Sequence, residues 1–228
     1  DTLATLHRHP DATDIDLSPY DSDRLIQEVV ELTDWFYSLR YGIEMAQSAR
    51  VLFLEAWKQT LSNLPPAPST LVLRDYHVDN LMILSDREGV SKCGLLDFQD
   101  AVLGHASYDL VSLLEDARRD VTDELRKTMR ARYFSHMPEL NRDAFNTWYA
   151  VLGVQRHTKV VGRFSRFAVR DGNPRNLVHI PRVMELLVQG LNGPALGLIK
   201  AWFEEFLPDV TKGLSEFCFA QMNLNKYT

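Results

Sequence analysis

A short stretch of the chain, Thr70–Asp100, gathers polar residues whose types and spacing could do chemistry. Four residues separate Asp75 from Asn80, and Asp97 follows at the end of another short apolar run. A carboxylate can orient an attacking hydroxyl and take its proton, while a carboxylate and an amide oxygen can together hold Mg²⁺. Such groups, on loops at the ends of strands, are the parts that phosphoryl transfer requires.

Three short apolar runs must position these groups, and they are typical of β-strands. Leu71–Leu73 is expected to be a strand that ends by projecting Asp75 into a loop. Leu81–Leu84 and Cys93–Leu96 are expected to be strands joined by the polar turn Ser85–Lys92.

The expected hairpin is centred on Glu88-Gly89, so that Leu84 faces Cys93 and Asn80 faces Asp97. Directly opposed residues have Cα atoms roughly 4.5–5.5 Å apart, close enough for an amide and a carboxylate to share one cation. Mg²⁺ suits such a sparse site because it keeps several waters and takes other ligands from phosphates.

Asp75 lies in the loop before this hairpin, outside the predicted cation site. We therefore assign Asp75 as the catalytic base, and Asn80 and Asp97 as the residues that hold the metal and, through it, the nucleotide. The alternative is that these side chains only satisfy backbone donors in turns.

The segment Leu73–Asn80, LRDYHVDN, resembles the H-G-D-x-H-x-x-N loop of the aminoglycoside phosphotransferase-like family, and its Asp-to-Asn spacing matches the kinase catalytic loop. Asp97–Gln99 resembles the family's metal-binding segment, and Tyr108–Leu110 its Tyr-Asp-Leu segment. The resemblance implies a kinase-like fold, with ATP and Mg²⁺ as cofactors.

Three positions depart from the family's motifs. Leu73 replaces the first histidine of the loop, Arg74 replaces its glycine, and Gln99 replaces the glycine that usually follows Asp-Phe or Asp-Trp. None of these changes removes a group expected to touch the metal or the hydroxyl, so the inferred chemistry is intact.

The length of 228 residues fits one large domain or a domain and a half. The 228 residues are 45% hydrophobic, and no run approaches the roughly 18 apolar residues of a membrane helix. The net charge of −6 argues against nucleic acid as a partner. Cys93 and Cys218 are too few for a disulfide framework, so a cytoplasmic location is expected.

The segment Asp1–Val72 has a single glycine, Gly42, and a single lysine, Lys58. A kinase of this type needs a glycine-containing loop over the nucleotide and a strand lysine on its phosphates. We therefore expect residues 1–228 to form the C-terminal lobe of a kinase-like enzyme. This lobe is α+β and mainly α, the N-terminal lobe is absent from the chain, and the chain alone is expected to be inactive.

Helical periodicity dominates the remaining sequence. A helix is expected from Ser22 to Leu39 with Gly42 at its end, and a second from Ile43 to Leu61, before Pro65–Pro68. Further helices are expected over residues 108–114, 122–134 and 141–169, from residue 181, and over 194–206.

The expected helix over residues 141–169 carries a basic face. Its cations recur at steps of three and four residues: Arg156, Lys159, Arg163, Arg166 and Arg170. They therefore line one side. This face is either a rail for an anionic substrate or a salt-bridged surface. The resemblance favours Arg156 as a substrate contact.

Two other residues are candidates for contacts with the acceptor. Asp34 could present its carboxylate to a sugar beside Trp35 and Phe36, although rings at that spacing also fit a core. His77, at the second histidine of the family's loop, is expected to orient the loop or to contact the acceptor. Asp109 is expected to cap the following helix or to accept hydrogen bonds from the backbone of the loop.

Most of the chain, including Glu31–Phe36, LRDYHVDNLM and Gln155–Arg166, is similar to amino-sugar kinases of bacterial cell-wall recycling. The resemblance implies phosphorylation of the anomeric hydroxyl of N-acetylmuramate or N-acetylglucosamine. An aminoglycoside or choline-like amino-alcohol kinase is the alternative within the same chemistry, and the basic face counts against its cationic acceptor. A protein that is not an enzyme, namely a kinase-like binding module, is the remaining alternative. The presence of Asp75, Asn80 and Asp97 argues against it.

Overall fold

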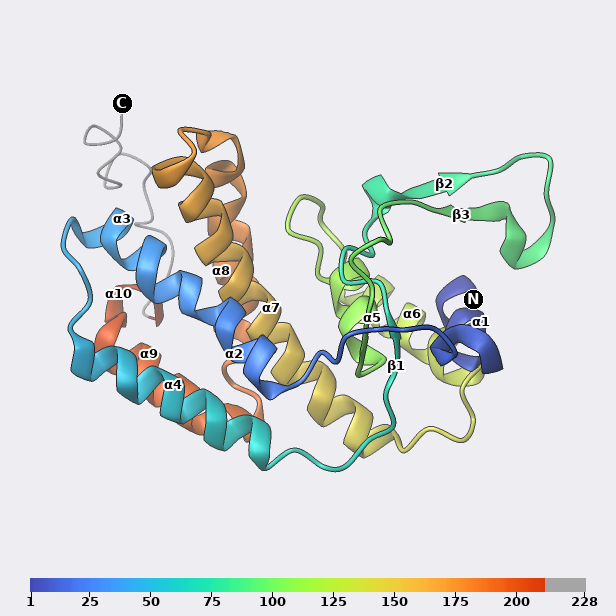
Figure 1. Ribbon diagram of the computed structural model, residues 1–228, viewed down its shortest axis with the longest axis horizontal. Helices are drawn as coiled ribbons and strands as arrows, with labels where there is room; N and C mark the ends of the chain where they lie inside the picture. Colours follow the sequence, from blue (N-terminus) through green and yellow to red (C-terminus); the bar gives the residue numbers. More distant parts are fainter. Residues whose placement is uncertain (212–228) are drawn as a thin grey trace. The chain divides into compact units, whose positions relative to one another are not determined.

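The computed structural model describes residues 1–211, so Cys218 lies outside the described residues. Helices make up most of this part of the chain, and two small antiparallel sheets complete it (Figure 1). This confirms the expected α+β, mainly α, class. The chain divides into two compact units, of which the first comprises Asp1–Asp21 and Pro65–Leu152. The second comprises Ser22–Leu64 and the residues from Gly153 onward.

The first unit contains both sheets and several short helices (Figure 1). Its strands are β1 (Thr70–Val72), β2 (Leu81–Ile83), β3 (Cys93–Leu95) and β4 (Val102–Gly104). Its α-helices are α1 (Thr2–Arg8), α5 (Ser107–Leu114), α6 (Asp123–Ser135) and the beginning of α7 (Arg142–Arg170). Single 3₁₀ turns lie at Pro10–Thr13, Val78–Asn80 and Gly89–Lys92.

The hairpin of β2 and β3 forms where it was predicted, but its register was predicted wrongly by one residue. Ile83, not Leu84, pairs with Cys93. The reason lies in the turn, because the 3₁₀ segment Gly89–Lys92 closes the hairpin in place of a two-residue turn. The Leu84 N–H donates to the Lys92 carbonyl at 2.8 Å, and this bond fixes the observed pairing.

Aromatic side chains from α6 and α7 form much of the core of the first unit. The ring of Phe145 lies 5.6 Å from that of Tyr133 and 5.2 Å from that of Phe134, measured between centroids. Each such pair contributes about 0.5–1.5 kcal/mol beyond the burial of its area. This core supports α5, which is buried along most of its length.

The second unit is helical throughout its described part. Its elements are α2 (Ser22–Glu31), a π-helical turn (Leu32–Phe36), α3 (Tyr37–Tyr41), α4 (Gln47–Ser62), the rest of α7, a 3₁₀ segment (Pro174–His179), α8 (Ile180–Gly190), a 3₁₀ turn (Pro194–Leu196), α9 (Gly197–Phe206) and α10 (Pro208–Thr211). α4 begins four residues later than the predicted Ile43, because Gly42 ends α3 in a left-handed conformation and an irregular stretch follows.

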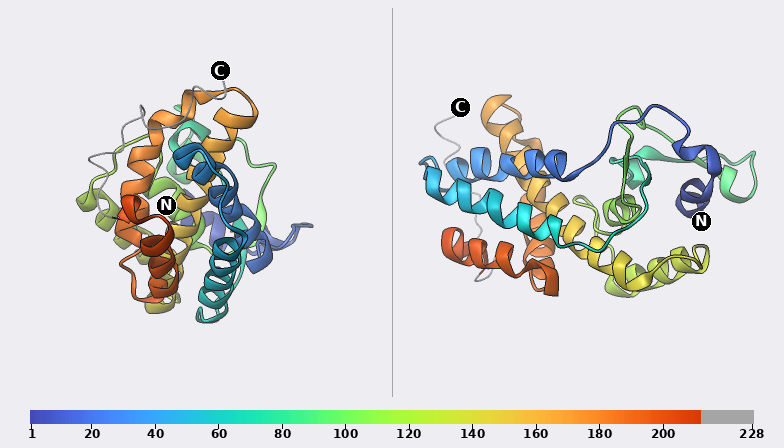
Figure 2. Two further views of the ribbon diagram at one scale, coloured as in Figure 1. Left: turned by 90° about the vertical axis from the view of Figure 1, so that its left-hand side faces the viewer. Right: turned by 60° about the horizontal axis from the view of Figure 1, so that its bottom comes forward.

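Close helix packing holds the second unit together. α4 and α9 lie side by side (Figures 1 and 2), and the Trp202 indole N–H donates to the Ala49 carbonyl at 2.8 Å. α7 approaches the end of α2 so closely that a Cβ on Gly162 would lie 2.4 Å from the backbone of Glu31. Only glycine fits at that crossing.

Within residues 1–211, no helix combines the length and the apolar character needed to cross a bilayer.

Candidate active site

The loop that follows β1 is held by a buried carboxylate from α5. Asp109 is fully buried, and its two oxygens accept the backbone N–H groups of Leu73 and Arg74 at 2.7 and 2.9 Å. The Ser112 hydroxyl donates to the Arg74 carbonyl at 3.4 Å. Of the two roles expected for Asp109, bonding to the backbone of the loop is therefore confirmed.

Among the described residues, two that are not glycine have a positive φ, and both lie in this region. Arg74 has φ of 68° and Asp97 has φ of 56°. The left-handed conformation costs a residue with a side chain roughly 1–2 kcal/mol. Backbone strain of this kind persists where surrounding contacts enforce it, and it clusters at functional sites. For Arg74 the enforcing contacts are those with Asp109 and Ser112.

Asn80 and Asp97 converge at the open end of the hairpin. Asn80 Nδ2 lies 3.5 Å from Asp97 Oδ2. In the observed register the backbone of Asn80 bonds to Leu96, whose N–H donates to the Asn80 carbonyl at 2.9 Å. The positive φ of Asp97 directs its carboxylate back to Asn80, so the two side chains meet although they are not a directly opposed pair.

The donor atoms at this point fit Mg²⁺. The Asp97 carboxylate is exposed, and the Gln99 amide donates to its Oδ1 at 2.6 Å. Asn80 Nδ2 donates to the Asp75 carbonyl at 2.9 Å and also faces Asp97, so the amide oxygen is the Asn80 atom that a cation would use. Among residues 1–211, no group of three or more His, Cys, Asp or Glu side chains is arranged to hold a metal. A two-ligand oxygen site is therefore compatible with Mg²⁺ but not with a structural zinc.

The carboxylate of Asp75 is exposed to solvent next to this pair. Its backbone is fixed on both sides: the Asp75 N–H donates to the Leu73 carbonyl at 2.8 Å, and the Asp75 carbonyl accepts from the His77 N–H at 3.1 Å. A side chain held in this way can meet a hydroxyl group that approaches from solution.

His77 and Asp79 support the turn that presents Asn80. His77 Nε2 lies 3.4 Å from Asn80 Nδ2, within reach of a hydrogen bond. Arg119 donates to Asp79 Oδ1 at 2.8 Å, and this bond keeps the pKa of the Asp79 carboxyl below its usual value. Sequence reasoning missed Arg119, because nothing in the spacing of the loop between α5 and α6 marks one arginine there.

Asp34 and Arg156, the other predicted substrate contacts, belong to the second unit. Asp34 lies in the π-helical turn, accepts a hydrogen bond from the Thr33 hydroxyl at 3.4 Å and pairs with Arg50. Arg156 is buried within α7. The four other candidates, Asp75, His77, Asn80 and Asp97, lie together in the first unit.

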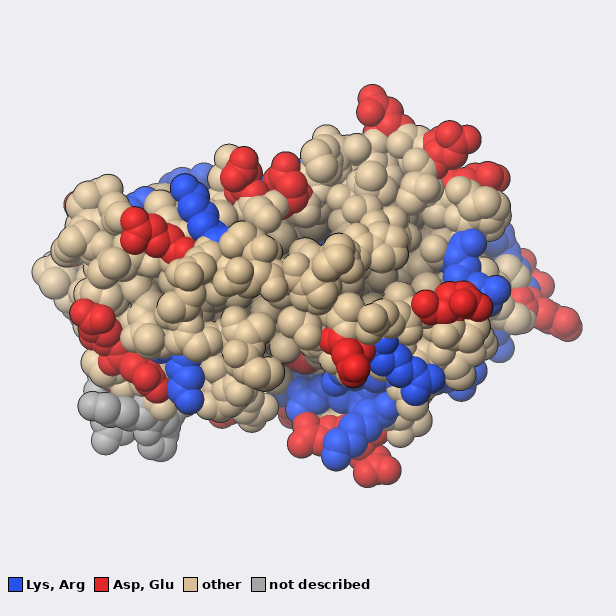
Figure 3. All heavy atoms as spheres, turned by 90° about the horizontal axis from the view of Figure 1, so that it is seen from below, with Lys and Arg blue, Asp and Glu red and all other residues tan. Residues whose placement is uncertain are grey.

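The basic face of α7 is salt-bridged. Lys159 lies 3.0 Å from Glu28, and Glu31 accepts from both Arg163, at 2.7 Å, and Arg166, at 2.8 Å. On the face of the molecule drawn in Figure 3, basic and acidic side chains are likewise interspersed. Of the two interpretations of this face, the salt-bridged surface describes these three cations.

Comparison with known proteins agrees with this geometry. A model described as "Phosphotransferase enzyme family" matches residues 1–143. The N-acetylmuramate/N-acetylglucosamine kinase of Caulobacter vibrioides is 44% identical over 139 residues, which are 61% of this chain and 38% of that protein. Kinases of the same name from Neisseria meningitidis serogroup B and Pseudomonas putida are 37% and 31% identical, over 75% and 80% of this chain.

The chain spans 38%, 52% and 53% of the length of these three relatives, about half or less of each. The matches confirm the family resemblance carried by LRDYHVDN and Asp97. Since the family model covers more than half of the sequence, the chain belongs to the phosphotransferase enzyme family.

Proposed function

We propose that the protein is an ATP-dependent, Mg²⁺-dependent kinase of an N-acetylated amino sugar and that it transfers the γ-phosphoryl group to the anomeric hydroxyl. In this proposal residues 1–228 belong to a kinase-like C-terminal lobe. The observation that carries it is the convergence of Asn80 and Asp97 within 3.5 Å, beside the exposed Asp75. ATP as the donor would place the reaction in the cytoplasm.

Each residue of the loop has a distinct role in this mechanism. Asp75 accepts a hydrogen bond from the acceptor hydroxyl, orients it and takes up its proton as the hydroxyl oxygen bonds to the γ-phosphorus and the bond from that phosphorus to ADP breaks. Asn80 and Asp97 would hold Mg²⁺, which when bound neutralises charge on the phosphates of the nucleotide. Asp109 acts through the backbone of Leu73 and Arg74, which precede Asp75. His77 orients the Asn80 amide.

The sugar acceptor is inferred from the relatives that align with 61–80% of this chain and are named for N-acetylmuramate and N-acetylglucosamine. We assign Asp34 and Arg156 as residues that contact it. The pair with Arg50 keeps the Asp34 carboxylate in one position, where it can accept a hydrogen bond from a sugar hydroxyl.

Blocked acceptors test the position of transfer. N-acetylglucosamine and N-acetylmuramate should be phosphorylated in the presence of ATP and Mg²⁺, whereas the methyl glycoside of N-acetylglucosamine, which lacks a free anomeric hydroxyl, should not. The assay should use the protein at its natural length, with phosphorus NMR to identify a sugar 1-phosphate. Phosphorylation of the methyl glycoside would disprove the anomeric assignment.

Two further outcomes would favour the alternatives. Turnover of a cationic aminoglycoside or of choline without turnover of either amino sugar would identify an amino-alcohol kinase. Binding of an amino sugar without turnover of any acceptor, under conditions where ATP also binds, would identify a non-catalytic binding module.

A further inference from the structure

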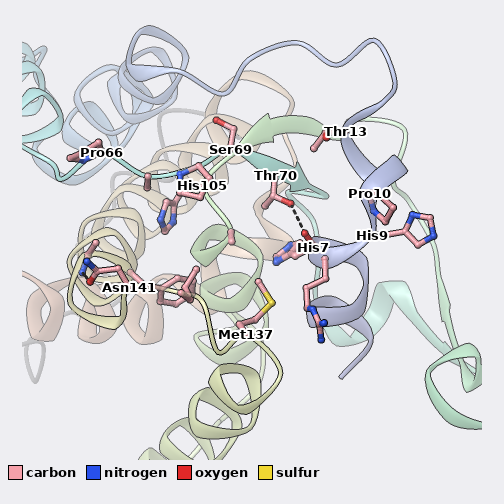
Figure 4. A pocket seen from close by; sticks show the side chains of 17 residues that line it. His7, His9, Pro10, Thr13, Pro66, Ser69, Thr70, His105, Met137 and Asn141 are labelled. Atoms are coloured by element: carbon pink, nitrogen blue, oxygen red, sulfur yellow. Dashed lines mark hydrogen bonds between the residues drawn. The ribbon is translucent and has the colours of Figure 1, made fainter.

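A cavity of about 340 Å³ lies in the first unit, away from the candidate active site (Figure 4). Thr70, the first residue of β1, lines it, whereas Asp75 follows the last residue of that strand. Figure 4 shows the labelled side chains coming from α1 and the turn after it, the segment that leads into β1, the residues after β4, and the stretch between α6 and α7. The volume falls in the range of small-molecule sites, roughly 300–1,000 Å³.

The walls of the cavity are fixed by hydrogen bonds between elements distant in sequence. The Trp148 indole N–H donates to the Pro65 carbonyl at 2.8 Å and so ties the proline-rich wall to α7. The Thr70 hydroxyl donates to the His7 carbonyl at 3.4 Å and ties β1 to α1. The floor includes Phe145, which is 1% exposed. The cavity is therefore formed before any ligand enters.

Two histidines that line the cavity are neutral at physiological pH. Burial lowers the pKa of His105 to about 4 and that of His7 to about 3. His105 Nδ1 accepts the backbone N–H of Ser107 at 3.1 Å, so the proton of the neutral ring is on Nε2. His105 therefore offers a hydrogen-bond donor, and Trp148 stacks on its ring at 4.7 Å between centroids.

The polar groups around the cavity are matched to an anion or a hydrogen-bond acceptor. Arg8 lines it and is exposed, with Nη1 donating to the His136 carbonyl at 3.2 Å. Thr13 and Ser69 contribute hydroxyl groups. None of the lining residues in the described chain is an aspartate or a glutamate, so a cationic ligand would meet Arg8 without a compensating charge.

We propose that this cavity is a second binding site, distinct from the phosphotransfer site, for a small aromatic acid. The ring of the ligand lies against Phe145 and Met137. Its carboxylate pairs with the guanidinium of Arg8 and accepts a hydrogen bond from a polar group that lines the cavity. The proposal does not depend on the function assigned to Asp75, because no residue of the loop Leu73–Asn80 lines the cavity.

Three ligands with one ring system and different charges test the proposal: 2-naphthoate, 2-naphthamide and 2-naphthamidine. Calorimetric titration of the protein should show that naphthoate binds most tightly, the amide less tightly and the amidine least tightly. The affinities for naphthoate and the amide should differ roughly tenfold, as expected for a charge-assisted contact. Equal or tighter binding of the amidine, or no binding of naphthoate, would overturn the proposal.

Variants locate the binding. Ala144→Leu should fill the cavity from the first turn of α7 and lower the affinity for naphthoate at least tenfold. Ala131→Leu, at an exposed position of α6, should leave that affinity unchanged. Arg8→Gln should abolish the preference for naphthoate over the amide, and Arg8→Lys should keep it. Since Arg8 is exposed, this second pair remains informative even where Ala144→Leu does not fold.

A control separates the two sites. Asp97→Ala should leave naphthoate affinity unchanged, because Asp97 does not line the cavity. Loss of naphthoate binding in Asp97→Ala, with Arg8→Gln unaffected, would mean that the ligand binds at the phosphotransfer site and would contradict the proposal.

Discussion

The loop Leu73–Asn80 of the first unit and the basic face of α7 in the second contrast in how they hold charge. In this loop and at Asp97 beside it, irregular backbone with two left-handed residues presents exposed carboxylates. On α7, a regular helix presents cations that pair with Glu28 and Glu31. The three paired cations of α7 stabilise the fold, whereas the carboxylates beside the strained backbone are those that we propose for chemistry.

The largest expected effect is on the exposed carboxylate of the loop. Asp75→Asn should lower kcat by roughly 10²–10⁴, the usual contribution of a positioned base, while ATP affinity is retained. Steady-state kinetics with N-acetylglucosamine and a nucleotide-binding assay measure the two effects. Asp86→Asn, in the exposed turn of the hairpin, is the matched control and should be active. Unchanged turnover of Asp75→Asn would remove Asp75 from the mechanism.

Acid should weaken the first unit in particular. The pKa values of His7 and His105 are lowered in the folded state from 6.5 to about 3 and about 4, so the unfolded chain binds more protons between pH 6.5 and about 4. Stability is therefore present above pH 6.5 and falls as the pH decreases, by up to about 1.4 kcal/mol per pH unit for each histidine.

Urea denaturation at a series of pH values measures this slope. His7→Gln should reduce it, and His9→Gln, at an exposed position, should not. A free energy of unfolding that is flat between pH 6.5 and 5 in the wild type would contradict the neutral, buried state of the two rings.

The next largest effect is expected at Asp109, the buried carboxylate that holds the loop. Asp109→Asn replaces a carboxylate that accepts two backbone N–H groups and should lower the free energy of unfolding by about 1.5–3 kcal/mol. It should also lower kcat, because the backbone of Leu73 and Arg74, which leads into Asp75, loses its support. Urea denaturation and kinetics on the same variant test both; lower stability with wild-type kcat would show that the loop keeps its geometry without Asp109.

Glu31→Gln tests the role of the ion pairs on the basic face of α7. Because it removes ion pairs with Arg163 and Arg166, stability should fall by about 1 kcal/mol, with kcat and KM for the sugar unchanged. Partial exposure of Arg163 keeps the effect small. A large rise in KM for N-acetylmuramate, with little loss of stability, would mean that these arginines serve the substrate after all.

The smallest effect is expected at the strained residue of the loop itself. Arg74→Gly relieves a φ of 68° but increases the freedom of the unfolded chain and removes the contact of the guanidinium with the Tyr20 ring, 5.6 Å away. These terms oppose each other, so the free energy of unfolding should change by less than about 1 kcal/mol. Arg74→Ala keeps the strain and loses the contact, and it should be the less stable of the two.

The parts of the site carried by local spacing could be predicted from the sequence. The interval from Asp75 to Asn80 and the apolar runs beside it were enough to place the loop and the hairpin. The register was not predictable from Glu88-Gly89, because a 3₁₀ turn and a two-residue turn are both compatible with these residues. The left-handed conformations of Arg74 and Asp97 were also hidden, since neither residue is a glycine.

Ion pairs between residues distant in sequence could not be predicted either. The partners of Arg163 and Arg166 lie on α2, more than 130 positions earlier in the chain. Periodicity could therefore show that the cations share one face but could not decide what that face meets. Arg119 was missed for the same reason, because its partner Asp79 is 40 positions away.

The π-helical turn at Leu32–Phe36 has a consequence for protein engineering. In it the Tyr37 N–H donates to the carbonyl five positions earlier, that of Leu32, so this turn contains one residue more than an α-helical turn. Deleting a single residue there should restore a continuous α-helix and rotate every later side chain of α3 by about 100°. Arg40 and Tyr41 would then turn away from Asp209, to which both donate hydrogen bonds. A deletion that looks harmless in a helix would thus detach α3 from α10.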